Sequence, residues 1–346
     1  MTYITKICEA KRKNRKFIQI YKDYLFPGLY ISYSIDANRF VWKRCDHFLD
    51  RFKYYDKEKV LKLKYKVGAF LISNKKRIEN KTDRSCGTTL YVSRKGNFKV
   101  FSQDMKHVYY FIKDEELFNR MIHYNANYAP YFGDSVIESF DPANRRISER
   151  FIIEKHNWRS NDDKIINAAK WLIKSSSKYL KSVDTIEKQT FSTFAESVRK
   201  RANNSELSEF VADLIKMLNG ADCDIPFVYQ HNDVVLSNII KDSKGYTLFD
   251  YEFYRENIFY YDSLMWLVWE AIQYYHDIFL EEYLSGKYDD LYLELFNSAG
   301  FKYDPQKRQI YIIMFIIANI NIHIIMGDNT SIVKYQRVVA MLQTNK

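Results

Sequence analysis

The stretch "YQHNDVVLSNIIKDSKGYTLFDYEF", residues 229–253, combines closely spaced polar residues with short apolar runs. A His, an Asp and an Asn fall within eight residues, and an apolar pair follows. After the turn signal "KDSKG", a second apolar run ends in Asp250, and Glu252 stands two residues later. Two short β-like runs around such a turn predict a hairpin, which would return Asp250 alongside the loop that holds the first three residues.

Transfer of a phosphoryl group from a nucleotide makes two demands on side chains. A carboxylate must orient the attacking hydroxyl or accept its proton, and oxygen ligands must hold Mg²⁺ against the phosphates. Asp233 offers the first function, while Asn238 and Asp250 offer the second. The spacing H-x-D-x-x-x-x-N, followed by an apolar strand that ends in Asp, is the arrangement of kinase catalytic and metal loops. Any one of these residues alone is more typical of a turn or a helix cap, but the complete pattern favours the functional interpretation.

The segments "HNDVVLSNII" and "LFDYEF" resemble the aminoglycoside phosphotransferase and choline kinase group of the protein-kinase-like superfamily. The pattern of that group is H-G-D-x-x-x-x-N-hydrophobic, followed by hydrophobic-D-[FWY]-E/D. The residues that match it are His231, Asp233, Asn238, Asp250 and Glu252. Downstream, "NIFYYDSLMWLVWEA" is similar to the family segment in which an Asp, here Asp262, supports the catalytic loop from a following helix. The resemblance covers roughly residues 88–330 and is strong over 229–270.

The resemblance implies a role for each matching residue. Asp233 would be the catalytic base, Asn238 and Asp250 would bind Mg²⁺, and His231 would be a structural prop for the loop. Glu252 would add to the metal shell or contact substrate. The implied cofactors are Mg²⁺ and ATP, with GTP as the alternative nucleotide, and the implied reaction is phosphoryl transfer to a hydroxyl of a small molecule or a cell-envelope sugar.

The segment expected to bind the nucleotide departs from the family pattern. The phosphate loop would fall at "SRKGNFKV", where Gly96 is the only glycine, and the strand position of the phosphate-gripping lysine holds Tyr109 or Tyr110. The residues expected around the nucleotide are therefore Gly96, Lys99, Lys113 and Glu149, with Glu115 or Glu116 as a helical partner for the lysine. Surface ion pairs are the other interpretation of these charges. If no lysine substitutes, the alternative function is a catalytically silent kinase-like binding or scaffold protein.

The order of patterns along the chain predicts an α+β, protein-kinase-like bilobal fold. Residues 88–114 read as short strands, 114–128 as a helix that opens with acids, and 134–153 as two more strands around "DPANRR". From residue 162 onward the chain reads as mostly helical. The expected organisation is a basic N-terminal extension of unknown role (1–85), an antiparallel-sheet N-lobe (86–156) and a larger helical C-lobe with the catalytic and metal loops (157–346).

The net charge of +10 indicates anionic partners. Basic runs at 11–16 and 62–77 lie in the expected extension, so contact with the inner membrane surface through this segment is one expectation, and solvated positive faces are the other. No zinc-finger or RNA-recognition signature is present, so nucleic acid is not expected as a partner. The expected partners are a nucleotide and a hydroxyl-bearing small molecule or glycan, because a polycationic acceptor would suit an acidic surface better.

Three further features have structural rather than catalytic interpretations. The four cysteines are scattered without a C-x-x-C pair, which predicts reduced thiols in a cytoplasmic protein. The apolar run 310–326 carries Asn319, Asn321 and His323, so a buried core helix is expected rather than a membrane span.

The aromatic and acidic cluster of Tyr260, Tyr261, Trp266, Trp269 and Glu270 invites comparison with an ammonium-binding cage, but its helical spacing favours core residues.

Overall fold

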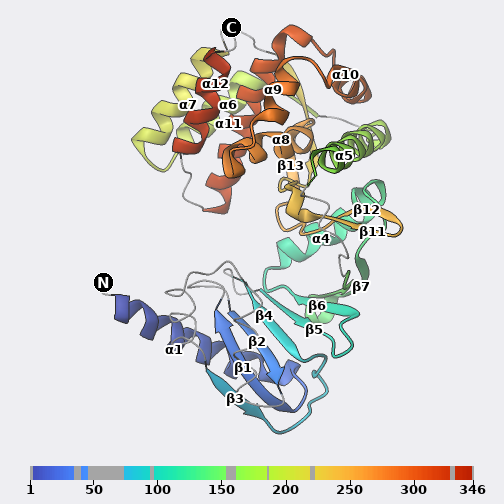
Figure 1. Cartoon of the computed structure of the whole chain (residues 1–346), viewed down its shortest axis with the longest axis vertical. Coiled ribbons are helices and arrows are strands. Elements are labelled where there is room, and N and C mark those ends of the chain that lie inside the picture. Colours follow the sequence, from blue (N-terminus) through green and yellow to red (C-terminus); the bar gives the residue numbers. More distant parts are fainter. Residues whose placement is uncertain are drawn as a thin grey trace. The chain divides into compact units, whose positions relative to one another are not determined.

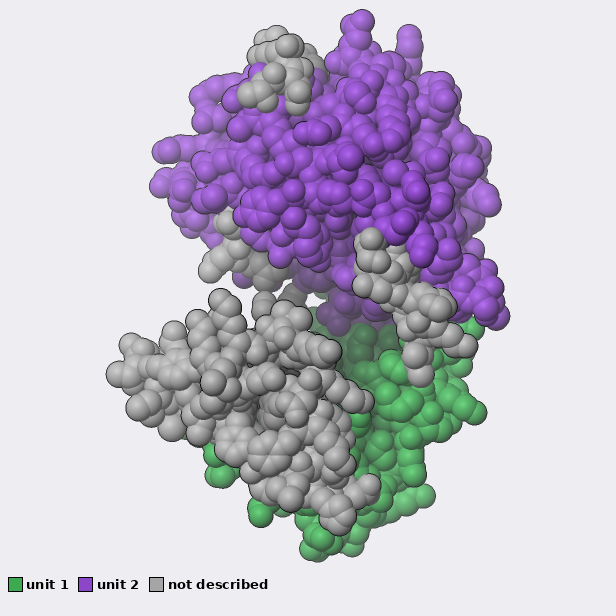
Figure 2. Space-filling view, in the orientation of Figure 1, with its two compact units in different colours: residues 1–119, 136–153 green, residues 120–135, 154–346 purple. Residues whose placement is uncertain are grey.

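The computed structural model describes residues 3–34, 40–45, 74–93, 97–152, 161–184, 187–218, 223–327 and 332–344. The chain forms two compact units, which Figure 2 shows in different colours. Unit 1 comprises residues 1–119 and 136–153, and unit 2 comprises residues 120–135 and 154–346. Gly96 and most of the basic run 62–77 lie outside the described residues.

Unit 1 is built on one antiparallel sheet of eight strands in the order β3-β1-β2-β4-β5-β6-β8-β7 (Figure 1). The strands are β1 (Gly28–Ser34), β2 (Phe40–Cys45), β3 (Lys75–Ile78), β4 (Thr89–Val92), β5 (Phe98–Phe101), β6 (His107–Phe111), β7 (Ile137–Asp141) and β8 (Arg146–Arg150). Its helical segments are α1 (Tyr3–Tyr21), η1 (Lys22–Tyr24), η4 (Pro142–Asn144) and the start of α4 (Glu115–Asn127). Strands β4 to β8 and helix α4 occupy the stretches that the sequence predicts for them.

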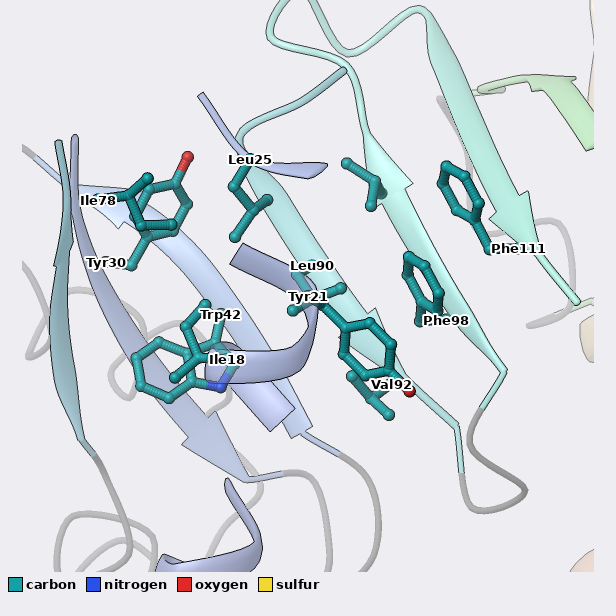
Figure 3. Packing of buried hydrophobic residues seen from close by; sticks show 11 residues of the cluster. Ile18, Tyr21, Leu25, Tyr30, Trp42, Ile78, Leu90, Val92, Phe98 and Phe111 are labelled. Atoms are coloured by element: carbon teal, nitrogen blue, oxygen red, sulfur yellow. The ribbon is translucent and has the colours of Figure 1, made fainter. Parts of the chain in front are cut away.

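The described residues among the first 85, namely 3–34, 40–45 and 74–85, do not form a separate extension, contrary to the expected domain boundaries. They supply α1 and three strands of the same sheet. Figure 3 shows Ile18 and Tyr21 of α1 beside Tyr30, Trp42 and residues of β4 to β6 in one buried cluster. The physical reason is burial of apolar surface: the apolar side chains of α1 cover a face of the sheet that would otherwise be exposed to water. The basic residues between them obscure this pattern in the sequence.

Unit 2 is mainly helical. Its helices are the end of α4, η3 (Ala129–Tyr131), α5 (Asp162–Ser182), α6 (Phe191–Arg201), α7 (Ser205–Met217), η6 (Leu236–Asn238), α8 (Tyr261–Tyr274), α9 (Ile278–Leu284), α10 (Asp289–Ser298), η7 (Pro305–Lys307), α11 (Arg308–Met326) and α12 (Ile332–Thr344). A three-stranded sheet has the order β13-β10-β9, from β9 (Glu187–Thr190), β10 (Asp224–Gln230) and β13 (Arg255–Ile258). Strands β11 (Ile239–Asp242) and β12 (Gly245–Leu248) form the predicted hairpin. The expected α+β fold, with an antiparallel-sheet lobe and a mainly helical lobe, is confirmed.

Helix α11 forms the centre of unit 2 (Figure 1). Within the described residues, one segment, Pro305–Met326, is long and apolar enough to cross a membrane, yet 67% of its most apolar window is buried inside the fold. The Asn319 side chain in this helix hydrogen-bonds the hydroxyls of Tyr261 and Tyr335. A buried amide with partners on two neighbouring elements is typical of a core helix, as the polar interruptions of the run predict.

Candidate active site

The loop 231–238 connects β10 to β11 and ends in the single turn η6. The Asn238 side chain folds back over this loop, and its Nδ2 donates to the Asp233 backbone oxygen and to Asp233 Oδ2, both at 2.9 Å. Five residues apart in sequence, the two side chains are thus in direct contact. Both of these hydrogen bonds use Nδ2, so Oδ1 of Asn238 is left as a potential ligand oxygen.

The β11–β12 hairpin returns the chain to the same loop. Ile239 pairs with Leu248, and the Phe249 amide donates to the Asn238 backbone oxygen at 3.0 Å. The next residue, Asp250, has a φ of +65°, in the left-handed region that Asp and Asn tolerate better than most residues. The hairpin thereby brings the second acid next to the first loop, as the sequence pattern predicts.

His231 is fully buried and lies between the loop and the end of the hairpin. Its Nδ1 accepts the Asp233 backbone N–H at 3.3 Å, and its Nε2 lies 3.1 Å from the Phe249 backbone oxygen. This pattern requires the neutral tautomer that carries its proton on Nε2. Burial lowers the pKa of His231 to about 3, which keeps the ring neutral. The histidine therefore ties the loop to the strand that precedes Asp250.

Asp262, in the first turn of α8, holds the backbone of the loop. Its Oδ2 accepts the His231 amide at 2.6 Å, and its Oδ1 accepts the Asn232 amide at 2.9 Å. The carboxyl is completely buried, and burial raises its pKa to about 6 despite these hydrogen bonds. The contact is the one that the resemblance implies for this residue.

Asp233 is the carboxyl with the most perturbed ionisation in the site. Burial and then the neighbouring Asp250 raise the pKa of Asp233 to about 8, while the hydrogen bond from Asn238 acts in the opposite direction. A buried carboxyl whose ionisation is disfavoured by a neighbouring carboxylate is typical of a site that binds a cation. Perturbed carboxyls of this kind also cluster at functional sites.

Asn232 is a site residue that the sequence analysis did not select. The family pattern has glycine at this position, and the φ of Asn232 is +64°. Its Nδ2 donates to the backbone oxygens of Gln230 (2.9 Å), Phe253 (3.2 Å) and Arg255 (2.8 Å). Its Oδ1 accepts from Asn257 Nδ2 at 2.6 Å. The side chain therefore joins the end of β10 to the start of β13. In the sequence, the one indication of a special backbone conformation here is an Asn, which tolerates positive φ, at the position of the family's glycine.

The oxygen donors of this site fit Mg²⁺. Asn238 Oδ1 and the Asp250 carboxylate are hard ligands, and Mg²⁺ in kinases is held by one or two such groups together with phosphates. Among the described residues, no group of three or more His, Cys, Asp or Glu side chains is arranged to hold one metal ion. Glu252 is therefore not part of a three-carboxylate cluster with Asp233 and Asp250, and its role as a ligand stays a prediction.

The two lysines expected around the nucleotide lie on opposite faces of the sheet of unit 1. Lys99 Nζ lies 3.7 Å from Glu149 Oε2 and 4.6 Å from the centre of the Tyr110 ring. Lys113 Nζ lies 5.6 Å from the centre of the Tyr21 ring, which belongs to the cluster under α1. Because Phe98 and Val100 face that cluster, alternation along β5 points Lys99 to the opposite face. Lys99 and Lys113 are thus on opposite faces and do not form one site.

The aromatic and acidic cluster at the start of α8 is part of the core except for Trp269, which is partly exposed and has Lys334 Nζ 5.8 Å from its ring centre. Tyr260, Tyr261 and Trp266 are at most 1% exposed, and Glu270 is also buried. Tyr260 stacks on Phe296, and Trp266 packs against Phe279. These contacts agree with the core interpretation of their helical spacing.

No family model matches the chain, and no curated protein matches it in sequence. The solved structures to which it is similar include a choline/ethanolamine kinase family protein from Mesorhizobium loti, with 12% identity, a TM-score of 0.43 and coverage of 72% of this chain and 84% of that chain. A choline kinase from Streptococcus pneumoniae has 16% identity and a TM-score of 0.42, over 72% of this chain and 89% of that one. An aminoglycoside phosphotransferase from Streptomyces rimosus has 13% identity and a TM-score of 0.38, over 65% of this chain and 90% of that one. All three proteins are of the group that the loop motif resembles.

Proposed function

We propose that this chain is an ATP- and Mg²⁺-dependent phosphotransferase that acts on a hydroxyl of a small molecule or a cell-envelope sugar. The observation that carries the proposal is the double hydrogen bond from Asn238 Nδ2 to the backbone and side chain of Asp233. It fixes a carboxylate beside an amide side chain, and the hairpin returns the backbone next to Asp250 to the same loop, where the charge of Asp250 acts on Asp233. A proton acceptor next to two hard oxygen ligands is what phosphoryl transfer requires.

In this proposal Asp233 orients the acceptor hydroxyl and takes its proton. Bound Mg²⁺ would neutralise charge on the transferred phosphoryl group, held by Asn238 Oδ1 and Asp250. Burial is the main cause that raises the pKa of Asp233, and repulsion from Asp250 adds to it; a cation held by Asp250 would offset this second, smaller cause. Asn238 keeps Asp233 in one rotamer, and Asp262 keeps the loop backbone in place.

We assign the phosphate-binding cation of unit 1 to Lys99. Strand β6, with the sequence HVYYF, has no lysine at the position that the family uses. Lys99 on the neighbouring strand is held between Glu149 and the Tyr110 ring, and its side chain is 22% exposed. A lysine oriented by a carboxylate can bind phosphate as a point charge. Glu149 would then orient the lysine, and Lys113 would take no part.

The net charge of +10 supports an anionic or glycan acceptor in preference to a polycation. A basic protein also gains attraction to the anionic inner leaflet. The proposed location is therefore the cytoplasm, at the inner membrane surface when the acceptor is lipid-linked. GTP remains the alternative phosphate donor in the proposal.

The test is release of ADP from Mg-ATP in the presence of a panel of sugars, phosphorylated sugars and amino alcohols, with Asp233→Asn as the matched control. The proposal expects acceptor-dependent turnover that the variant loses. Turnover that is equal in the variant would contradict the role of Asp233.

The absence of lysine from β6 favours one other candidate, a catalytically silent binding protein, for which no acceptor in the panel would increase ADP release above the buffer rate.

A further inference from the structure

Tyr128 stands one residue after the end of α4 and extends its last turn, since its amide donates to the Tyr124 backbone oxygen at 2.9 Å. The Tyr128 hydroxyl donates to Asp262 Oδ2 at 2.6 Å, and neither residue is exposed to solvent. No motif in the sequence marks this tyrosine, and it lies 134 residues from its partner. It is the third donor to the carboxylate that holds the loop 231–238.

The Asp262 carboxylate is shared among three donors with different origins. Oδ1 accepts the Asn232 amide alone, whereas Oδ2 accepts both the His231 amide and the Tyr128 hydroxyl. A buried carboxylate needs hydrogen bonds to offset its lost hydration. Because two of the donors belong to the loop itself, the hydroxyl is the donor that fixes the carboxylate from outside the loop.

The ring of Tyr128 is well placed for this task because its position is set by neighbouring rings. Its centre lies 4.3 Å from that of Phe132, in a stacked arrangement, and 4.8 Å from that of Tyr179, edge-on. The Tyr254 ring closes a third side at 5.6 Å. A phenol confined on three sides has little freedom to move its hydroxyl away from Asp262.

We infer that Tyr128 is a positioning residue: its hydroxyl fixes the Asp262 carboxylate, and through it the backbone of His231 and Asn232 that precedes Asp233. The hydroxyl joins the end of helix α4 to the proposed catalytic loop. The kinetic consequence rests on the proposed function, but the effect on the backbone does not.

Tyr124 provides a matched control on the preceding turn of the same helix. It is also buried, and its ring stacks on Tyr251 with the centres 4.6 Å apart. Within the part of the chain that the structure describes, its hydroxyl has no hydrogen-bond partner. Tyr124→Phe therefore removes a buried hydroxyl from the same cluster of rings but removes none of the three hydrogen bonds that Asp262 accepts.

The experiment compares Tyr128→Phe with Tyr124→Phe by native-state hydrogen exchange of the His231 and Asn232 amides, and by kcat and KM for ATP once an acceptor is known. In Tyr128→Phe the two amides are expected to exchange roughly tenfold faster or more, because their acceptor is no longer fixed. The value of kcat should fall by about tenfold while KM for ATP is unchanged. In Tyr124→Phe neither quantity should change.

Amides of the β10–β13 pair, such as Val228, serve as an internal reference for the stability of unit 2. Selective acceleration at His231 and Asn232 supports the inference. Acceleration of all these amides together, or of none, would overturn it and leave a role in core stability only. If the wild type transfers phosphate to no acceptor but the selective acceleration is present, the positioning role stands and the proposed function fails. If the wild type transfers phosphate but Tyr128→Phe shows no selective acceleration, the proposed function stands and the positioning role fails.

Discussion

Asp233 and Asp250 differ in what their replacement should do, although both are acids of one site. Asp233→Asn keeps a side chain of the same size that can still accept from Asn238 but cannot take a proton. We expect kcat to fall by roughly 10²–10⁴-fold, with nucleotide affinity within about twofold of wild type. Isothermal titration with Mg-ATP alongside initial rates separates the two effects. A loss of affinity as large as the loss of rate would contradict the assignment of Asp233 as the base.

His231 should give the protein a specific pH dependence. Its pKa is lowered to about 3 by burial, from an ordinary value of 6.5. The folded state therefore binds fewer protons than the unfolded state, so its stabilising contribution is fully present above pH 6.5 and is lost as pH falls towards 3. The free-energy difference between wild type and His231→Gln should shrink by about 1.4 kcal/mol per pH unit below pH 6.5.

Urea denaturation of both proteins at pH 7.5, 6.0 and 5.0 measures this difference directly. The comparison with the variant is needed because Asp233 and Asp262 have raised pKa values and act in the opposite direction: their contributions to stability decline as pH rises. These contributions are common to both proteins and cancel. A free-energy difference that is constant across the three pH values would show that His231 is not held neutral.

Single residues of the loop could be predicted from the sequence where chemistry and spacing were both informative. The contact between Asp233 and Asn238 and the return of Asp250 follow from a spacing of five and a four-residue hairpin turn. Asn232 and Tyr128 could not be predicted in the same way. Apart from the Gln230 backbone oxygen, their partners lie 21 to 134 residues away in the chain and come close only after folding.

At the level of elements, the Asn232 side chain should contribute to the joint between β10 and β13. Asn232→Gly keeps the positive φ without strain but removes four side-chain hydrogen bonds. We expect a loss of about 2–3 kcal/mol in unfolding free energy, and Asn232→Ala should cost roughly 1 kcal/mol more because of the left-handed backbone. Chemical denaturation of wild type, Asn232→Gly and Asn232→Ala measures the order of their unfolding free energies. Equal stability of Asn232→Gly and wild type would mean that the glycine of the family pattern serves equally well here.

Helix α1 should behave as a structural part of unit 1. Ile18 is 1% exposed and belongs to the core cluster, whereas Ile20 on the same helix is 49% exposed. Ile18→Ala should lower the unfolding free energy by about 2–4 kcal/mol, while Ile20→Ala should stay within about 0.5 kcal/mol of wild type. Thermal and urea denaturation of the pair test this. Equal, small effects of both substitutions would favour a detachable basic extension after all.

The elements of unit 1 were predictable to different degrees for a physical reason. Strands β4, β5 and β6 are consecutive hairpin neighbours, and their alternation and turn residues are visible locally. Strand β1 instead pairs with β2 on one edge and with β3 on the other, and β3 begins 30 residues after β2 ends. Pairing across such a distance leaves no local signal, so the start of the chain looked like a separate segment.

For the whole molecule, the division into a sheet unit and a helical unit followed from the order of sequence patterns, but the boundaries did not. Helix α4 starts in unit 1 and ends in unit 2, so a single cut near residue 156 cannot describe the chain. The basic charge is likewise a property of the whole molecule. It favours anionic ligands in general, but it selects no particular acceptor.

The most direct test of the central claim is the melting temperature of the purified chain with ATP, with and without Mg²⁺, for wild type, Asp250→Asn and Lys99→Met. Ligand that binds only the folded state stabilises it by about 2.7 kcal/mol at a concentration 100 times Kd. The account predicts a rise that needs Mg²⁺, that Asp250→Asn abolishes and that Lys99→Met reduces. Asn is chosen at position 250 because it tolerates the φ of +65°. No rise at millimolar ATP, or a rise that is the same without Mg²⁺ and in Asp250→Asn, would contradict a working metal–nucleotide site.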